Sequence, residues 1–193
     1  MRQQRERGGR EEGRDEGERN ESASRRREVS QLTDKAERLE RLLDTLSKQS
    51  GGEDAVGPSG GIRPWKGVLD WPARGTLLET FGRHKNPKFD TFTNSNGIAV
   101  AVPLGTPVRA VYAGRAVYAQ WLAEYGNLVI LDHGDGMLTL YAWLQGVEVK
   151  AGMPVSAGTE IGLAGYGPGR DDSGFYFEVR DRQKASDPIA WLR

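Results

Sequence analysis

The sequence contains no cysteine, only two histidines, and no apolar run long enough to form a membrane helix. The lack of cysteine excludes disulfides and thiolate metal sites, but it does not fix the compartment, because many periplasmic proteins also lack cysteine. Charge of either sign is not in excess, since 27 basic residues balance 27 acidic ones. This balance gives no broad electrostatic basis for binding nucleic acid, and we expect no nucleic-acid partner.

Apolar side chains are scarce at the N-terminus. Residues 1–28 contain no valine, leucine, isoleucine or aromatic residue, so they bury too little apolar surface to offset the entropy of ordering them. We expect a charged arm there that is disordered or a fraying helix. This arm also lacks the apolar core of a signal peptide, so no export signal is visible in the chain.

The pattern changes at residue 29. Residues 29–50 carry apolar side chains three or four positions apart, which predicts either a short coiled-coil helix or an amphipathic helix packed on its own domain. Glycine, serine and proline over residues 51–64 predict a flexible linker. Residues 65–193 hold every Trp and Phe of the chain and are long enough for one globular domain. The apolar seam of the predicted helix consists of Val29, Leu32, Ala36, Leu39, Leu43 and Leu46.

The C-terminal domain alternates short apolar segments with turn signals. Many short strands, tight turns and no long helix predict an all-β domain of antiparallel sheets. The polar segment 82–96 is expected to be a loop, and the closing segment 187–192 is expected to be a turn that docks Trp191. The predicted strands cover residues 76–81, 98–102, 107–111, 115–121, 128–131, 138–143, 147–149, 160–164 and 175–180.

One strand near the C-terminus organises the domain. Residues i and i+2 of a strand share a face, so Phe175, Phe177 and Val179 are predicted to enter the core while Tyr176 lies on the opposite face. The segment Gly174–Arg180 resembles the His-Leu-His-Phe-Glu-Val-Arg strand of the lysostaphin-like zinc peptidases, the LytM or M23 family.

Further segments match the same family in order. Gly97-Ile98-Ala99-Val100 resembles its Gly-Ile-Asp-Ile, and Thr139-Leu140-Tyr141-Ala142-Trp143-Leu144 resembles its Thr-Leu-Tyr-Ala-His-Leu. The resemblance covers roughly two thirds of the chain, and so many ordered matches make chance improbable. It implies an antiparallel LytM/M23 fold of the duplicated-hybrid-motif type.

The resemblance also implies a zinc site, and here its residues have changed. An active member holds zinc with a His-x-x-x-Asp pair and the second His of His-x-His, and two further histidines assist catalysis. The ligand positions correspond to Ser95, Ala99 and Tyr176, and the assisting positions to Trp143 and Gly174. Zinc hydrolysis needs about three protein ligands and a water. We therefore predict no metal, no cofactor and no catalytic residue.

Other residues do not rebuild that site in the sequence. The two histidines, His84 and His133, are expected to be solvated or to hydrogen-bond backbone groups, which is what lone loop histidines do more often than bind metal. Asp90 and Asp132 are expected to be turn residues for the same reason.

The emptied site is predicted to be an amphipathic groove. Tyr and Trp combine a large contact area with a hydrogen-bonding tip, and with Arg they dominate binding hot spots. The alternative is that Trp143 and Tyr176 simply refill the hole left by the metal, although Arg180 is harder to explain as a core residue. The residues predicted to bind a partner are Ser95, Asn96, Tyr125, Trp143, Tyr176, Glu178 and Arg180.

A helix followed by a degenerate LytM domain resembles the EnvC-like murein hydrolase activators. This resemblance implies a periplasmic or extracytoplasmic protein that binds and switches on N-acetylmuramoyl-L-alanine amidases during daughter-cell separation. Peptidoglycan, and a membrane-anchored division protein held by the coiled coil, are further partners that it implies. On this hypothesis Tyr176→Ala or Arg180→Glu abolishes amidase stimulation and leaves the fold intact. The alternatives are a zinc metallopeptidase with unorthodox ligands and a passive peptidoglycan-binding module.

Overall fold

The computed structural model describes residues 37–46, 48, 61–86 and 91–193. The chain divides into two compact units, Met1–Leu42 and Leu43–Arg193. Residues 37–46 are helical, and three of the six predicted seam residues, Leu39, Leu43 and Leu46, lie in this stretch and are buried. Lys48 of the predicted coil is also helical, and the remaining coil residues, the charged arm and residues 51–60 of the predicted linker lie outside the described residues.

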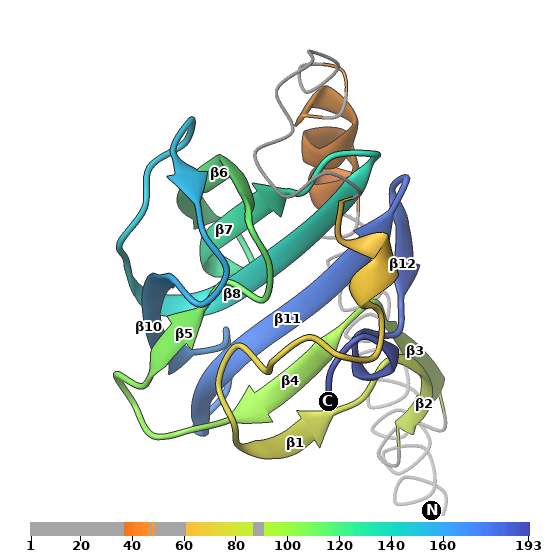
Figure 1. The fold of residues 1–193 in the computed structure, drawn as a ribbon. Coiled ribbons are helices and arrows are strands. Elements are labelled where there is room, and N and C mark those ends of the chain that lie inside the picture. Colours follow the sequence, from red (N-terminus) through yellow and green to blue (C-terminus); the bar gives the residue numbers. More distant parts are fainter. Residues whose placement is uncertain (1–36, 47, 49–60, 87–90) are drawn as a thin grey trace, which may run out of the picture. The chain divides into compact units, whose positions relative to one another are not determined.

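The described part of the C-terminal region is built from antiparallel strands and two short 3-10 helices (Figure 1). This confirms the predicted all-β architecture. In chain order the elements are η1 (Arg63–Trp65), β1 (Thr76–Glu79), β2 (Gly82–Asn86), β3 (Thr91–Ser95), β4 (Ile98–Ala101), β5 (Pro107–Arg109), β6 (Gly114–Leu122), β7 (Gly126–Asp132), β8 (Met137–Val147), β9 (Pro154–Val155), β10 (Glu160–Tyr166), β11 (Ser173–Asp181), β12 (Lys184–Ser186) and η2 (Pro188–Ala190).

Strand β11 lies at the centre of the main sheet. The sheet has the order β1-β4-β11-β10-β8-β7-β6-β9, and β11 also pairs directly with β8 and β12. Figure 1 shows β4, β11 and β8 side by side across the middle of the domain. Tyr176 of β11 is paired with Ala99 of β4 on one side and with Ala142 of β8 on the other. The three strands that carry most of the predicted site are therefore neighbours.

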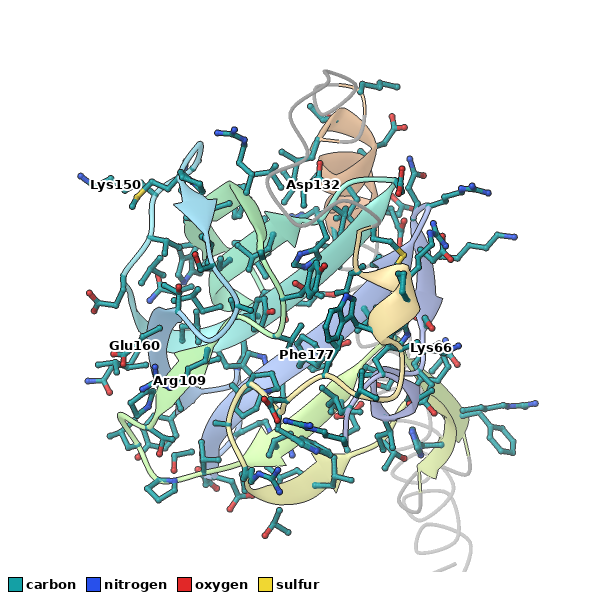
Figure 2. The ribbon with its side chains drawn as sticks, in the orientation of Figure 1. Lys66, Arg109, Asp132, Lys150, Glu160 and Phe177 are labelled. Carbon is teal, nitrogen blue, oxygen red and sulfur yellow. The ribbon has the colours of Figure 1, made fainter. Side chains whose placement is uncertain are left out.

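The alternation in β11 separates two faces as predicted. Phe175, Phe177 and Val179 are fully buried in the main core, and Phe177 lies at the centre of the domain, where its ring packs 5.2 Å from that of Tyr141 (Figure 2). The opposite face is also buried, because every residue from Gly174 to Arg180 is buried. Residues 137–144 of strand β8 are likewise all buried. Strands buried on both faces need an apolar cover on each.

The polar segment between β1 and β4 is a hairpin and not a loop, which corrects the prediction. Strands β2 and β3 pair in antiparallel register from Gly82 opposite Ser95 to Asn86 opposite Thr91, and they form a separate two-stranded sheet. Arg83 stacks 3.8 Å above the ring of Phe92, which is otherwise exposed. A hairpin that buries so little apolar surface gives no apolar alternation in its sequence. The structure also has the short strands β9 and β12, which the sequence reading did not predict, and residues 147–149 form no strand of their own because Val147 ends β8.

Two residues of the predicted linker pack against the domain. Ile62 belongs to the main core, and Arg63 forms a bidentate ion pair with Asp181 at 2.5 and 2.7 Å. At the other end the closing turn forms as predicted: Trp191 is buried, and the Nε1–H of its indole donates to the Ser186 hydroxyl at 3.0 Å.

Candidate functional site

The positions that correspond to the family's zinc ligands and catalytic histidines converge on one part of the sheet. Ala99 and Tyr176 face each other across β4 and β11, and Trp143 follows Ala142, the partner of Tyr176 on β8. Gly174 lies two residues before Tyr176, opposite Ala101. Ser95 ends β3 and lies next to the phenol of Tyr176. The degenerate positions therefore still form one site.

Three aromatic rings, those of Tyr125, Trp143 and Tyr176, fill this site, and we call them the aromatic cluster. The Tyr176 ring centroid lies 5.4 Å from that of Trp143 and 6.1 Å from that of Tyr125. Each of the three side chains is less than a tenth exposed. Tilted rings at such separations attract one another beyond their simple burial of area. The three rings therefore cover one another at the positions for which the sequence predicted a groove.

Trp143 is held in an unusual backbone conformation. Its φ is 64°, in the left-handed region that a bulky residue rarely adopts, and its N–H donates to the carbonyl of Tyr125 at 2.9 Å. Such conformations cost roughly 1–3 kcal/mol each and are found most often at functional sites. On one side the indole faces Tyr176, and Gly167 approaches it closely, since a Cβ at position 167 would lie 2.8 Å from two indole carbons.

Beside the cluster, Glu178 and Arg180 form a buried ion pair. The Arg180 Nε–H donates to Glu178 Oε2 at 2.8 Å, and the phenol of Tyr176 donates to Glu178 Oε1 at 2.7 Å. Arg180 is only 2% exposed and its Nη1 donates to the carbonyl of Gln183 at 2.8 Å. Burial, followed by the Glu178 carboxylate, holds the pKa of Tyr176 well above its usual range. Arg180 is thus a core residue, contrary to the reasoning that a guanidinium is hard to place there.

The other predicted binding residues lie at the turn between β3 and β4. Ser95 is buried, and its hydroxyl donates to the carbonyl of Gly97 at 3.1 Å, while Asn96 is partly exposed. Gly97 is required here because a Cβ would lie 2.3 Å from the carbonyl oxygen of Phe177. This close contact brings the turn against β11 and places Ser95 beside Tyr176.

Both histidines are engaged by protein groups. His84 Nε2 lies 2.6 Å from the carbonyl of Thr80. His133 is buried, with Nδ1 2.7 Å from the carbonyl of Ala113 and Nε2 2.7 Å from the hydroxyl of Thr139. Asp132 has the predicted turn role, since its carboxylate accepts from the N–H of Gly134 at 2.9 Å. The fourth residue, Asp90, lies outside the described residues.

The residues at the site do not fit the zinc ion that active members hold. Alanine and glycine offer no donor atom, and the phenol of Tyr176 is kept protonated by the upward shift of its pKa. Within the described ranges, no group of three or more His, Asp or Glu side chains is placed to hold a metal ion. Restoring the histidine at position 174 is also obstructed, because a Cβ there would lie 2.2 Å from the carbonyl oxygen of Val100.

We therefore expect purified protein to contain no stoichiometric zinc, and EDTA to leave its thermal unfolding midpoint unchanged. A structural or catalytic zinc would bind the folded state alone and raise the midpoint, so its removal would be seen directly. Metal analysis by mass spectrometry and a melting curve with and without chelator test this. One zinc per chain that disappears in His84→Ala or His133→Ala protein would contradict the prediction.

An all-β fold that brings these positions together on one sheet points to the zinc-peptidase class. Residues 93–188 match the peptidase family M23, and the chain carries a domain of that family. Murein hydrolase activator EnvC of Escherichia coli is 30% identical over 166 residues, covering 86% of this chain and 39% of EnvC. Murein hydrolase activator NlpD of the same species is 33% identical, covering 68% of this chain and 32% of NlpD. Cell division protein DipM of Caulobacter vibrioides is 33% identical, covering 68% of this chain and 22% of DipM.

Solved structures support the fold. A zinc-containing peptidase from Vibrio cholerae superposes with a TM-score of 0.59 at 25% identity, covering 64% of this chain and 40% of that one. The catalytic domain of lysostaphin from Staphylococcus simulans gives a TM-score of 0.52 at 26% identity, covering 60% of this chain and 90% of that domain. The chain spans less than half the length of the curated relatives described above. No helix among the described residues is long and apolar enough to cross a membrane.

The structure adds one residue that sequence reasoning missed. Arg170, in the loop between β10 and β11, places its guanidinium 5.2 Å from the Trp143 ring centroid and 3.6 Å from the carboxylate of Glu79. The segment Gly167-Pro168-Gly169-Arg170-Asp171-Asp172 is typical of a solvated turn, and nothing in its spacing indicates that the arginine returns to the site.

Proposed function

We propose that this chain is a non-catalytic activator of N-acetylmuramoyl-L-alanine amidases in cell-wall remodelling and daughter-cell separation. The observation that carries the proposal is the site itself, where all five positions of the family's zinc chemistry have changed and Tyr125, Trp143 and Tyr176 form an aromatic cluster. Such a site supplies neither a zinc-bound water nor a proton shuttle. It does supply the large aromatic side chains that anchor protein partners.

The relatives favour the same role. EnvC and NlpD are named murein hydrolase activators and DipM is named a cell division protein, each matching at 30% identity or more. We propose a periplasmic or otherwise extracytoplasmic location by the same likeness, since a further relative, from Haemophilus influenzae, is named an outer membrane antigenic lipoprotein. In this proposal the helix predicted over residues 29–50 binds a membrane-anchored division protein, and the C-terminal domain binds the amidase.

Partner binding at the cluster requires a change in exposure. In the structure Tyr125, Trp143 and Tyr176 are each less than a tenth exposed, so a partner reaches their faces only when this side of the sheet is uncovered. Hot-spot residues are found in desolvated pockets of complexes, and the cluster meets that description once a partner segment covers it. In this proposal the amidase segment displaces the protein groups that cover the aromatic cluster in the free protein.

Dye release from labelled sacculi tests the proposal. The domain alone, a purified amidase encoded by the same genome, and the two together are compared, and only the mixture should release dye well above the amidase alone. Trp143→His should reduce stimulation about tenfold or more, because it removes a central aromatic anchor. Trp65→His is the matched control, since Trp65 is half exposed and packs on Tyr112. Both variants must retain the circular dichroism spectrum of the parent protein.

Two outcomes would overturn the activator role, and a third would overturn only the part assigned to the aromatic cluster. Release by the domain alone that chelator abolishes would make it a metallopeptidase. Sedimentation of the domain with sacculi, with no response from any amidase of the genome, would make it a passive peptidoglycan-binding module. Equal stimulation by the Trp143→His and Trp65→His proteins would remove the aromatic cluster from the binding site.

A further inference from the structure

Arg170 stands at the edge of the aromatic cluster in a fixed position. Its guanidinium carbon lies 5.2 Å from the ring centroid of Trp143, within the range of a cation–π interaction. Gly167 makes this possible, because a Cβ there would lie 2.8 Å from both the indole and the Arg170 Cδ. The turn is closed by the Arg170 N–H, which donates to the Gly167 carbonyl at 3.1 Å. The loop therefore holds the arginine plane beside Trp143.

The hydrogen-bonding capacity of this guanidinium is largely unused. Arginine has five N–H donors. Its Nη1 lies 3.6 Å from Glu79 Oε2, beyond ordinary hydrogen-bond length, and its Nε is buried without a hydrogen-bond partner among the described residues. The side chain is 29% exposed, so a partner can reach it although part of its hydration is lost. A planar guanidinium with free edges is suited to bidentate recognition of a carboxylate.

We propose that Arg170 is a recognition residue of the amidase-binding site and that it takes the carboxylate of one acidic side chain in the partner segment. The proposal deepens the activator role and rests on it. In the free domain the carboxylate of Glu79 lies 3.6 Å from the Arg170 guanidinium and competes with the partner's carboxylate for it. Binding exchanges this weak pair for a close, charge-assisted one beside Trp143.

The surroundings favour a single carboxylate over a polyanion. Asp171 and Asp172 follow Arg170 and are both exposed, so with Glu79 the acidic groups here outnumber the arginine. A multiply charged ligand would be repelled. Tyr166, at the end of β10 just before the loop, is 53% exposed and offers an apolar surface. The partner segment is thus expected to carry one Asp or Glu flanked by apolar residues.

The test measures how tightly variants of the whole chain bind the purified amidase used above, and how strongly they stimulate it. Arg170→Gln should weaken amidase binding about tenfold or more, which is the range of a charge-assisted hydrogen bond. Arg170→Lys keeps the charge but lacks the planar pair of N–H donors that binds a carboxylate through both oxygens, so it should recover only part of the affinity. Arg109→Gln is the matched control, since Arg109 pairs with Glu160 at 3.8 Å and both lie at the periphery of the domain (Figure 2). It should bind as the parent protein does.

Glu79 supplies a second, independent readout. Glu79→Gln removes the competitor and should strengthen binding about two- to fivefold, the scale of an exposed ion pair, but only while Arg170 is present. A purely structural role of Arg170 would not give this gain.

Separate outcomes judge the two proposals. Absence of stimulation by the parent chain defeats the activator role itself. Stimulation by the parent chain with equal binding of the Arg170→Gln and Arg109→Gln proteins overturns the Arg170 proposal alone, as does a Glu79→Gln gain that persists without Arg170. Loss of sacculus binding in Arg170→Gln with unchanged amidase binding also overturns it, because the carboxylate would then belong to peptidoglycan.

Discussion

Arg180→Glu should lower the free energy of unfolding by about 3–5 kcal/mol, the cost of breaking a buried ion pair by removing one partner. Arg180 and Glu178 are 2% and 0% exposed, and the guanidinium satisfies the Glu178 carboxylate and the carbonyl of Gln183. The substitution leaves two carboxylates facing each other without water. Small domains have only about 5–15 kcal/mol of stability in total, so the loss is a large share of it.

Urea unfolding of the purified variants measures this effect. Arg109→Glu is the control, because Arg109 is half exposed and its long pair with Glu160 is worth at most about 1 kcal/mol. Should Arg180→Glu protein be insoluble, the milder Arg180→Met and the double variant Glu178→Met/Arg180→Met give the same information. The double variant should be more stable than Arg180→Met, since it leaves no uncompensated charge. An Arg180→Glu protein with the parent's urea midpoint would contradict the buried pair.

This expectation changes how the site must be probed. From the sequence, Arg180→Glu was expected to abolish amidase stimulation with the fold intact. Because Arg180 belongs to a buried ion pair, the substitution also destabilises the fold, so a loss of stimulation would not show loss of binding alone. Tyr176→Ala has the same weakness, because deleting a buried aromatic ring leaves a cavity that costs about 3–5 kcal/mol. Variants at Arg170 and Glu79, whose side chains are partly exposed, separate recognition from stability.

The period of β11 predicted which residues share a face and not how deeply each face is covered. Alternation assigned Phe175, Phe177 and Val179 to the core, and the structure confirms this. It could not show that Glu178 and Arg180 are buried on the opposite face, because burial there depends on neighbouring strands and on hydrogen bonds far away in the sequence. The two residues match the Glu-Val-Arg of the family's strand, which a structural ion pair explains better than a binding role.

Segments that bury little were the hardest to predict. The β2–β3 hairpin carries Arg83 on one strand and an exposed Phe92 on the other, so its sequence shows polar residues where a sheet strand would alternate. Ile62 is a single apolar residue among glycines and prolines, and one residue cannot create a periodic signal. The position of Arg170 depends on a loop that folds back onto Trp143, a tertiary contact that no local pattern contains.

The stability of the domain should fall by about 3 kcal/mol between pH 6.5 and pH 4 because of His133. Burial lowers the pKa of His133 to about 4, against 6.5 for a free imidazole. Between these values the unfolded chain binds a proton that the folded chain refuses, so stability is full above pH 6.5 and is lost as the pH falls toward 4. A shift of this size corresponds to about 3 kcal/mol.

Burial explains why His133 resists protonation. The Ala113 carbonyl can only accept, so Nδ1 carries the proton of the neutral ring, and Nε2 lies 2.7 Å from the hydroxyl oxygen of Thr139. That hydroxyl donates to the Tyr141 phenol at 3.1 Å. The Ala113 carbonyl and the nearby Asp132 favour the charged ring, but the cost of burying an imidazolium is larger and holds the pKa low.

Urea unfolding at pH 7.0, 6.0, 5.0 and 4.5 tests the prediction. His133→Gln should lose most of the pH dependence in this range, at the cost of lower stability at pH 7, while His84→Gln removes the other imidazole and should keep the parent's slope. The window also excludes Asp181, whose pKa the Arg63 guanidinium lowers below its ordinary 3.8, so that its contribution is lost only at still lower pH. An unchanged slope in His133→Gln would assign the acid sensitivity to other groups.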